Sequence, residues 1–365
     1  MKKLRIAQFI DTHSIGGAET MMLRLSLALI NSGNNVIILH FGNPHIEEFC
    51  ALNNIESSVV PHKRYYKSIK TIYLFSLLFS RHIKKLDIDI IHTHLYGPAT
   101  GVSLGAFIYN IPHIATIHDV YTVKERAGRG INLMLTQFFG TSLITVSKDM
   151  QHFYEKHIPF SKDINCIYNG FNLTKSPDKN FDFIDKNALT LITVGRIIPL
   201  KRQIHQLKVL ANYIRDNNIQ MIFVGDGEDL MKLNNTIIEL SLTDKVIALG
   251  ERDDVEELLA ASDVFILSSE SEGLSCSIIE AMSSGLACVV SNVGGNKELI
   301  QHGVNGYIFE LDDDDSLINQ VDLMYKNKSQ RINMGKSGKN IADKIFSIEN
   351  MQAQYITAYN KLLKI

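Results

Sequence analysis

Short apolar runs alternate with longer amphipathic segments along the whole chain. Such runs stand at residues 4–10, 35–40, 88–94, 113–117 and 142–147 in the first half, and at 189–195, 220–225, 245–250, 263–267 and 287–291 in the second. Because they are continuously apolar rather than alternating, they indicate strands that are buried on both faces, as in a parallel sheet covered by helices. The pattern predicts an α/β protein in which each half is a doubly wound, Rossmann-like βα domain.

The length of the chain also favours two domains. At 365 residues it exceeds what one hydrophobic core comfortably holds. The segment 172–187 is polar, contains a proline and lacks periodicity, which is typical of a linker. We therefore expect a first domain at 1–171, a second at 188–346, and a C-terminal helix at about 347–365 that packs back on the first.

The composition is that of a packed globular protein. Hydrophobic residues make up 45% of the chain and charged residues 21%, which excludes disordered and fibrous classes. The four cysteines have no C-x-x-C spacing, which argues against a zinc site and against a secreted disulfide framework. The opening MKKLRIAQFIDTHS has an apolar run of about five residues, too short for a signal peptide. We expect a protein of the reducing cytoplasm.

The longest uncharged run, residues 90–118, does not have the composition of a membrane span. It contains four histidines, two prolines and three glycines, whereas a span needs about 20 mostly apolar residues. A strand, a helix and a second strand fit it better. We expect no transmembrane helix.

Charge is distributed unevenly along the chain. Residues 1–171 hold 17 Lys and Arg against 12 Asp and Glu, and residues 172–365 hold 20 against 27, so the halves carry about +5 and −7. Residues 62–85 contain seven of the basic residues, no acid and several aromatics. This segment is either a core helix with solvated ends or a peripheral contact with an anionic membrane. Both hold if 72–79 pack inside while an exposed loop touches lipid through Lys63, Arg64, Lys67 and Lys70.

The segment SSESEGLSCSIIEAMSSG, residues 268–285, is the first candidate for chemistry. It follows an expected strand, and doubly wound sheets bind ligands beyond the carboxyl ends of their strands. Gly273 allows close backbone approach, and the amides of Leu274 and Ser275 would open a helix, the kind of end that binds a diphosphate. Glu280, about two turns into that helix, could accept hydrogen bonds from the paired hydroxyls of a ribose. The alternative is that Glu272 is a solvated loop acid and Glu280 is paired within the fold.

Other loops supply the partners that such a site needs. In VGRIIPLK, Arg196 and Lys201 come just after another strand and could neutralise a diphosphate without a metal ion. VGDGEDL begins like a dinucleotide fingerprint, but Leu230 occupies the position of the third glycine. The run Asp312–Asp315 is expected to start a helix, where carboxylates suit the positive end of the dipole, rather than to bind metal.

Together these motifs resemble the retaining glycosyltransferases of family four, which have the two-domain GT-B architecture. The resemblance covers nearly the whole chain. It includes the Glu, seven residues, Glu motif that continues through EAMSSG to GGNKELI, together with IGGAE, TIHD, IYNGFN, VGR with the later lysine, VGDGE and LGERDDV. It implies two Rossmann-like domains that face each other across a cleft, and no metal cofactor.

The resemblance also implies roles for individual residues. Glu280 would hold the ribose hydroxyls, Glu272 would contact the transferred sugar, and the diphosphate would lie against Arg196, Lys201 and the backbone of Gly273, Leu274 and Ser275. From the first domain, Gly16 and Gly17 would cover the donor and His118 would lie beside the anomeric centre. The base would pack near Glu251 and Arg252, largely against backbone. Proline is common in relatives where this chain has Ser275 or Ala287, which puts the donor sugar in question.

The expected reaction moves a hexose or N-acetylhexosamine from a nucleotide-diphosphate sugar, preferably a UDP-sugar, to a saccharide acceptor. We expect this acceptor to be linked to polyprenyl diphosphate and the reaction to belong to surface polysaccharide or O-antigen synthesis. Leaving-group stabilisation would be electrostatic. The alternatives are a UDP-sugar epimerase of the same fold and a non-catalytic nucleotide-sugar-binding protein. His92 and His94 end a strand near the expected cleft and suggest acceptor contact or a structural role, since no third ligand has metal-site spacing. No nucleic-acid partner is expected.

Overall fold

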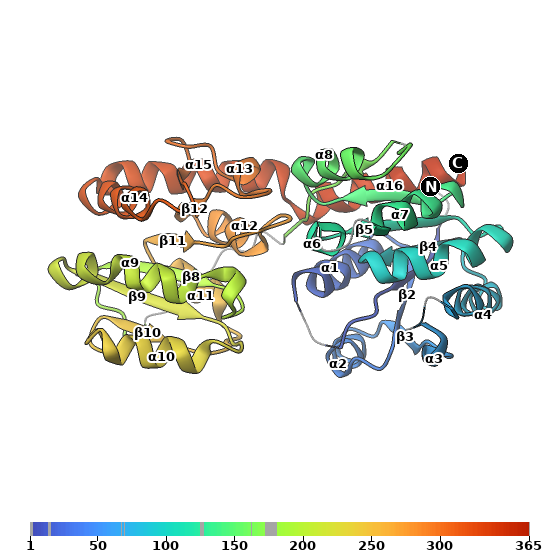
Figure 1. Ribbon diagram of the computed structural model, residues 1–365, viewed down its shortest axis with the longest axis horizontal. Helices are drawn as coiled ribbons and strands as arrows, with labels where there is room; N and C mark the ends of the chain where they lie inside the picture. The colour runs from blue at the N-terminus through green and yellow to red at the C-terminus, as the bar shows by residue number, and fades with distance from the viewer. Residues whose placement is uncertain are drawn as a thin grey trace. The chain divides into compact units, whose positions relative to one another are not determined.

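The computed structural model describes residues 3–13, 16–66, 68, 70–124, 128–161, 163–171 and 181–364. The chain divides into two compact units: unit 1 comprises Met1–Gly170 and Ile348–Ile365, and unit 2 comprises Phe171–Ser347. The last helix, red in Figure 1, therefore belongs to unit 1 although it follows unit 2 in the sequence. Of the segment predicted as a linker, residues 172–180 lie outside the described residues.

Unit 1 is built on a seven-stranded parallel sheet in the order β3-β2-β1-β4-β5-β6-β7. Its strands are β1 (Arg5–Phe9), β2 (Asn35–His40), β3 (Glu56–Val59), β4 (Ile90–His94), β5 (His113–Ile117), β6 (Ser142–Thr145) and β7 (Asn165–Cys166). Its helices are α1 (Gly17–Asn31), α2 (Pro44–Leu52), α3 (Lys63–Tyr66), α4 (Ile72–Lys84), α5 (Tyr96–Ile108), α6 (Tyr121–Lys124), α7 (Gly128–Phe138), α8 (Lys148–His157) and α16 (Ile348–Leu363).

Both faces of this sheet are buried, and side-chain alternation along β1 shows what covers each. Ile6 and Ile10 pack in a core with residues of α1 and α16. Ala7 and Phe9 pack in a second core with residues of α4 and α5. Successive strand residues point to opposite faces, so a strand between two helical layers must be apolar throughout, as the sequence pattern indicates.

Unit 2 is built on a six-stranded parallel sheet in the order β10-β9-β8-β11-β12-β13. Its strands are β8 (Leu189–Val194), β9 (Ile219–Val224), β10 (Val246–Ala248), β11 (Val264–Leu267), β12 (Ala287–Ser291) and β13 (Gly306–Phe309). A 3₁₀ turn, η1 (Pro199–Lys201), precedes the helices α9 (Gln203–Asp216), α10 (Leu230–Glu239), α11 (Val255–Ala260), α12 (Cys276–Ser283), α13 (Asn296–Leu299), α14 (Asp314–Lys326) and α15 (Lys328–Ile345).

All ten strands predicted from apolar runs are present, and β3, β7 and β13 are additional. The aspartate run begins a helix as predicted: Asp313 is the N-cap of α14, and its carboxylate accepts a hydrogen bond from the Ser316 amide at 2.9 Å. Within the described residues, no helix combines the length and the apolar character needed to cross a bilayer.

Candidate functional site

The predicted phosphate-binding residues border the switch point of the unit 2 sheet. The chain runs from β8 outward through β9 and β10 and then returns to β11 on the other side of β8. Such a reversal opens a crevice at the carboxyl ends of the two adjoining strands, where doubly wound sheets bind ligands. Arg196 and Lys201 follow β8, and Glu272 follows β11. Two loops predicted separately from sequence therefore meet at one edge of the sheet.

An ion pair joins these two loops. Lys201 Nζ donates to Glu272 Oε1 at 2.5 Å, and the two side chains are only 16% and 10% exposed. Two opposite charges that are mostly removed from water attract each other far more strongly than an exposed pair does. The alternative in which Glu272 is a solvated loop acid is therefore wrong. Arg196 is exposed and lies on the same loop as Lys201.

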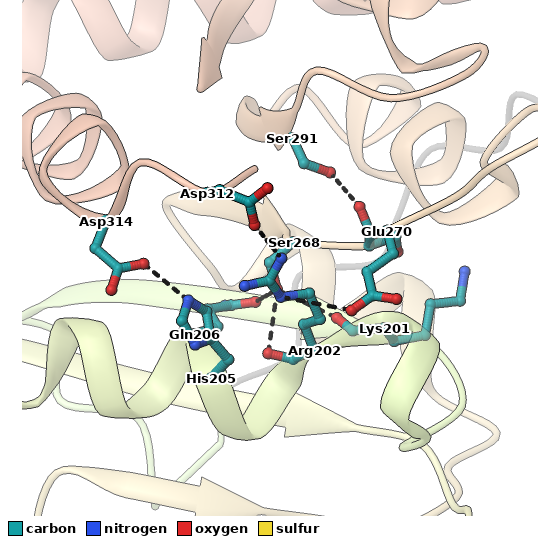
Figure 2. Close-up of polar contacts among 10 residues, drawn as sticks. Lys201, Arg202, His205, Gln206, Ser268, Glu270, Ser291, Asp312 and Asp314 are labelled. Atoms are coloured by element: carbon teal, nitrogen blue, oxygen red, sulfur yellow. Dashed lines mark hydrogen bonds and ion pairs between the residues drawn. The ribbon is translucent and has the colours of Figure 1, made fainter. Parts of the chain in front are cut away.

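Buried hydroxyl and amide groups fix the conformation of the Lys201 loop, as Figure 2 shows. Ser268 Oγ lies 3.2 Å from the Lys201 carbonyl oxygen and 2.8 Å from Gln206 Oε1. Gln206 Nε2 in turn donates to Thr193 Oγ1 at 2.8 Å. These residues were not predicted from the sequence. Only their positions could have indicated their role, since Ser268 directly follows β11 and Gln206 faces it from the first turn of α9.

The neighbouring cation Arg202 was also not predicted from the sequence. Its backbone is left-handed, with φ of 55°, between η1 and α9. Its guanidinium lies 3.4 Å from Asp312 and 4.0 Å from Glu270 (Figure 2). Arg202 is thus engaged by two carboxylates.

Helix α12 begins beside the ion pair. Ser275 is its N-cap and, like Leu274, is buried. The first amides of a helix have no partner within it and carry partial positive charge, so the start of α12 suits an anion. Glu280 lies about one turn into the helix rather than the two turns predicted, because α12 starts at Cys276 and not at Leu274.

The glycines of the motif GGNKELI allow a close backbone contact. A Cβ on Gly294 would lie 1.9 Å from the Glu272 carbonyl oxygen, and a Cβ on Gly295 would lie 2.3 Å from that of Gly273. Gly294 also has φ of +46°. The loop after β12 therefore packs directly on the loop that carries Glu272, which explains why two residues without side chains stand here.

The glycines of VGDGE have a similar packing role. A Cβ on Gly225 would lie 2.1 Å from the Gly195 carbonyl oxygen, and one on Gly227 would lie 2.3 Å from that of Ile197. These glycines let the loop after β9 pack against the loop after β8. The partial match to a dinucleotide fingerprint is thereby explained by packing.

The two residues predicted near the base lie toward the edge of the sheet. Glu251 and Arg252 follow β10, which β9 separates from β8, and both are exposed. The Arg252 guanidinium pairs with the Asp254 carboxylate through contacts of 2.8 and 2.7 Å. Among the described residues, the structure does not bring Glu251 or Arg252 into contact with Lys201 or Glu272.

Unit 1 has its own switch point, between β1 and β4. Gly16 and Gly17 follow β1 and open α1, with Gly16 as the N-cap. Glu19, in the first turn of α1, is buried, and its carboxylate lies next to Gly16. Ile15 of the motif IGGAE lies outside the described residues.

His118 follows β5 and is half-buried. Its Nε2 lies 3.1 Å from His94 Nδ1, and burial lowers its pKa to about 4. His92 and His94 are completely buried, with hydrogen-bond partners on both ring nitrogens. The possibility that these two histidines contact an acceptor is therefore wrong, and the structural alternative holds.

The basic segment is less exposed than its charge suggests. Lys63 Nζ donates to the Phe41 carbonyl oxygen at 3.2 Å and lies 3.0 Å from His13 Nε2, so this ammonium does not extend freely into solvent. Arg64 and Lys70 are exposed, and Lys67 lies outside the described residues. Phe75 and Phe79 of α4 are buried as predicted, whereas Tyr73 and Leu74 are exposed and depart from the prediction that 72–79 pack inside.

In the described ranges of the chain, no group of three or more histidines, cysteines or carboxylates has the arrangement to hold a metal ion.

Comparison with known proteins gives matches over almost the whole chain. The model of the glycosyltransferase family 4 matches residues 15–175, and that of the glycosyl transferases group 1 matches residues 175–341. A UDP-Gal:alpha-D-GlcNAc-diphosphoundecaprenol alpha-1,3-galactosyltransferase of Escherichia coli is 31% identical, over 74% of this chain and 76% of its own. An N-acetyl-alpha-D-glucosaminyl L-malate synthase of Bacillus anthracis is 24% identical, over 96% of this chain and 95% of its own.

Solved structures agree on the fold. The crystal structure of Anabaena HepE in complex with UDP and glucose superposes with a TM-score of 0.83 at 20% identity, covering 98% of this chain and 100% of that one. A glycosyltransferase from Rickettsia africae gives a TM-score of 0.86 at 21% identity, covering 100% of both chains. With two Rossmann-like units of the GT-B type and motifs of the family in both, this chain belongs to the family 4 glycosyltransferases.

Proposed function

We propose that this enzyme transfers a hexose or N-acetylhexosamine from a UDP-sugar to a lipid-linked saccharide, with retention of anomeric configuration, in surface polysaccharide or O-antigen synthesis. The observation that carries the donor half is the Lys201–Glu272 pair at the β8–β11 switch point, beside the start of α12. The E. coli relative is named for a UDP-galactose donor and a diphosphoundecaprenol-linked acceptor, and the HepE structure holds UDP and glucose. Both support this choice of substrates.

Each residue near the switch point has a role in this proposal. The diphosphate lies against Arg196, Lys201 and the backbone of Gly273, Leu274 and Ser275, where positive charge and amide dipoles stabilise the departing anion. Glu280 accepts hydrogen bonds from the ribose, and Glu272 from the transferred sugar. His118, Gly16 and Gly17 are the unit 1 residues assigned to the donor. Glu251 and Arg252 lie on the loop assigned to the base.

The reaction forms a bond between the acceptor oxygen and the anomeric carbon while the bond from that carbon to the diphosphate oxygen breaks. The acceptor proton passes to the leaving phosphate, which becomes the stronger base as the bond breaks. Glu272 is paired with an ammonium at 2.5 Å, which makes its carboxylate a poor nucleophile. No covalent glycosyl-enzyme forms, so the two glutamates do not act as a glycosidase pair.

The test is a thermal-shift and hydrolysis screen over UDP-, GDP- and ADP-sugars, with wild type beside Glu280→Ala. One UDP-sugar is expected to stabilise and to be hydrolysed by the wild type, and to do neither with the variant. NMR of the released sugar should show the anomer of the donor at early times. Inversion, or a preference for GDP- or ADP-sugars, would overturn the proposal, and release of a new sugar nucleotide without acceptor would favour epimerisation.

We also propose that unit 1 makes peripheral contact with the anionic inner face of the membrane, where a lipid-linked acceptor lies. Arg64, Lys70, Tyr73 and Leu74 are all exposed and close in sequence, so this segment presents both cationic and apolar side chains, as interfacial binding requires. Flotation should show preference for anionic over neutral vesicles, lost in Arg64→Glu/Lys70→Glu. Equal flotation with both vesicle types would contradict this proposal.

A further inference from the structure

A row of polar side chains crosses the otherwise apolar α1 and α16 face of the unit 1 sheet. Strand register places Gln8 of β1 opposite His92 of β4, and His94 of β4 opposite Thr116 of β5. Ile6, Ile90 and Ile114, two residues before Gln8, His92 and Thr116, belong to the core shared with α1 and α16. By alternation, the polar residues project from that same face.

Hydrogen bonds connect this row to the last helix. His92 Nδ1 lies 2.8 Å from the Tyr359 hydroxyl, and His92 Nε2 lies 2.8 Å from Thr116 Oγ1. Thr116 Oγ1 lies 3.0 Å from the Tyr355 hydroxyl. His92 is therefore held on both sides, and its ring is tilted by 32° against that of His94, with centroids 4.3 Å apart.

A second set of contacts runs from Gln8 to His118. His94 Nε2 lies 2.7 Å from Gln8 Oε1, and His94 Nδ1 lies 3.1 Å from His118 Nε2. Burial lowers the pKa of both histidines, so near neutral pH each ring is uncharged and carries one N–H. The proton positions on the His94 and His118 rings are therefore coupled through the hydrogen bond that joins them.

The direction follows from the Gln8 oxygen, which can only accept. His94 must then carry its proton on Nε2, which leaves Nδ1 as an acceptor, and the proton between the two rings must belong to His118 Nε2. In the structure the Gln8 amide presents its oxygen to His94, and its buried Nε2 has no hydrogen-bond partner among the described residues.

We propose that Gln8 and His94 are positioning residues that hold His118 as the Nε2–H tautomer, so that its bare Nδ1 accepts a hydrogen bond from a sugar hydroxyl. His94 would act through His118 and does not itself touch substrate, since it is completely buried. The part of this inference that concerns a sugar hydroxyl rests on the proposed function. The part that concerns the tautomer of His118 rests on contacts within unit 1 alone.

The first measurement is ¹⁵N NMR of the imidazole groups in the full chain labelled with ¹⁵N-histidine, with the His118 signals assigned by their loss in His118→Asn. We expect a protonated Nε2 and an unprotonated Nδ1 for His118 near neutral pH. A reversed Gln8 amide would place the proton on Nδ1 of both rings. Finding it there in His118 would overturn the proposal, whatever the enzyme's substrate.

Variants test the coupling. Gln8→Met and His94→Phe should each leave His118 as a mixture of tautomers, whereas His94→Asn, whose amide oxygen can replace Nδ1 as acceptor, should restore the Nε2–H form. His113→Phe is the matched control, because this buried histidine projects from the opposite face, where it contacts Thr93 and Thr141. Unchanged His118 signals in a folded His94→Phe would refute the coupling.

Donor hydrolysis provides the functional arm. A neutral hydrogen bond is worth about 1 kcal/mol, and a tenfold rate change corresponds to about 1.4 kcal/mol. His94→Phe should therefore lower kcat about tenfold or less with little change in the donor KM, and His94→Asn should recover most of it. A correct tautomer pattern with no hydrolysis of any sugar nucleotide by wild type would contradict only the proposed function. A normal kcat in His94→Phe would contradict the positioning role.

Discussion

Lys201 Nζ donates to Glu272 Oε1 at 2.5 Å and so ties the loop after β8 to the loop after β11. If this ammonium also holds the diphosphate, Lys201→Met should lower donor hydrolysis about 100-fold, the usual effect of removing one preorganised electrostatic contact. The thermal shift given by the sugar nucleotide should shrink in parallel. Lys208→Met, which removes an exposed lysine from α9, is the control and should change neither quantity.

A double-variant cycle separates the two roles of the pair. If Lys201 and Glu272 act as one unit, Lys201→Met/Glu272→Gln should be much less impaired than the product of the single effects. Strictly multiplicative losses would show that the two side chains act independently and that their contact is incidental.

Gly294→Ala should damage both stability and activity. Its new Cβ would lie 1.9 Å from the Glu272 carbonyl oxygen, on a backbone with φ of +46°, so the loop that carries Glu272 must move. Gly303→Ala is the matched control, since Gly303 has φ of +80° but nothing within 4 Å of the new Cβ. The control should lose about 1–2 kcal/mol of unfolding free energy from backbone strain alone and keep its hydrolysis rate. Equal effects from both substitutions would mean that the contact with Glu272 is unimportant.

Tyr359→Phe should destabilise unit 1 without creating a cavity. The phenol oxygen lies 2.8 Å from Nδ1 of the buried His92, and an unsatisfied buried polar group costs about 1–3 kcal/mol. Tyr73→Phe, at a side chain 52% exposed, should stay within about 0.5 kcal/mol of wild type. Chemical denaturation of both variants measures the difference, and equal midpoints would argue against a role for the His92 contact.

Mild acid should weaken unit 1. Burial lowers the pKa of His113 from 6.5 to about 3 and that of His118 to about 4. Below pH 6.5 the unfolded chain therefore binds protons that the folded chain does not, and the unfolding free energy falls as the pH falls. Each such histidine contributes about 1.4 kcal/mol per pH unit between its unfolded and folded pKa values.

His113→Asn isolates one of these groups. The slope of unfolding free energy against pH, measured by denaturant titration between pH 6 and 4, should decrease by about one proton relative to wild type. An unchanged slope would show that the folded protein already protonates His113 in that range.

The sheets could be predicted from sequence because their central strands are buried on both faces and therefore continuously apolar. Of the strands that were missed, β3 and β7 lack that signal: β3 reads Glu-Ser-Ser-Val at an edge and is largely exposed, and β7 has two residues. Pairing with a neighbour, rather than burial, defines these two segments as strands, and a single sequence does not display pairing. β13, Gly-Tyr-Ile-Phe, is mostly buried but has only four residues.

The candidate site was predicted residue by residue but not as contacts. Lys201 and Glu272 are 71 residues apart, and only the placement of β8 beside β11 brings them together. Likewise, the contact of His94 with His118 needs the register of β4 on β5. Arg202 was missed because its neighbour Lys201 fitted the motif, and the left-handed turn that directs the two side chains to different partners has no signature in Arg-Gln.

The return of α16 to unit 1 has a consequence for biosynthesis. The face of β1 that carries Ile6 and Ile10 is completed by α16, which the ribosome makes after unit 2. At about 5–20 residues per second, synthesis of the intervening unit 2 takes roughly 10–35 s. During that interval the nascent unit 1 presents a partly uncovered apolar surface to chaperones. Unit 2, continuous in sequence from Phe171 to Ser347, is thus the first part of the newborn enzyme able to complete its core.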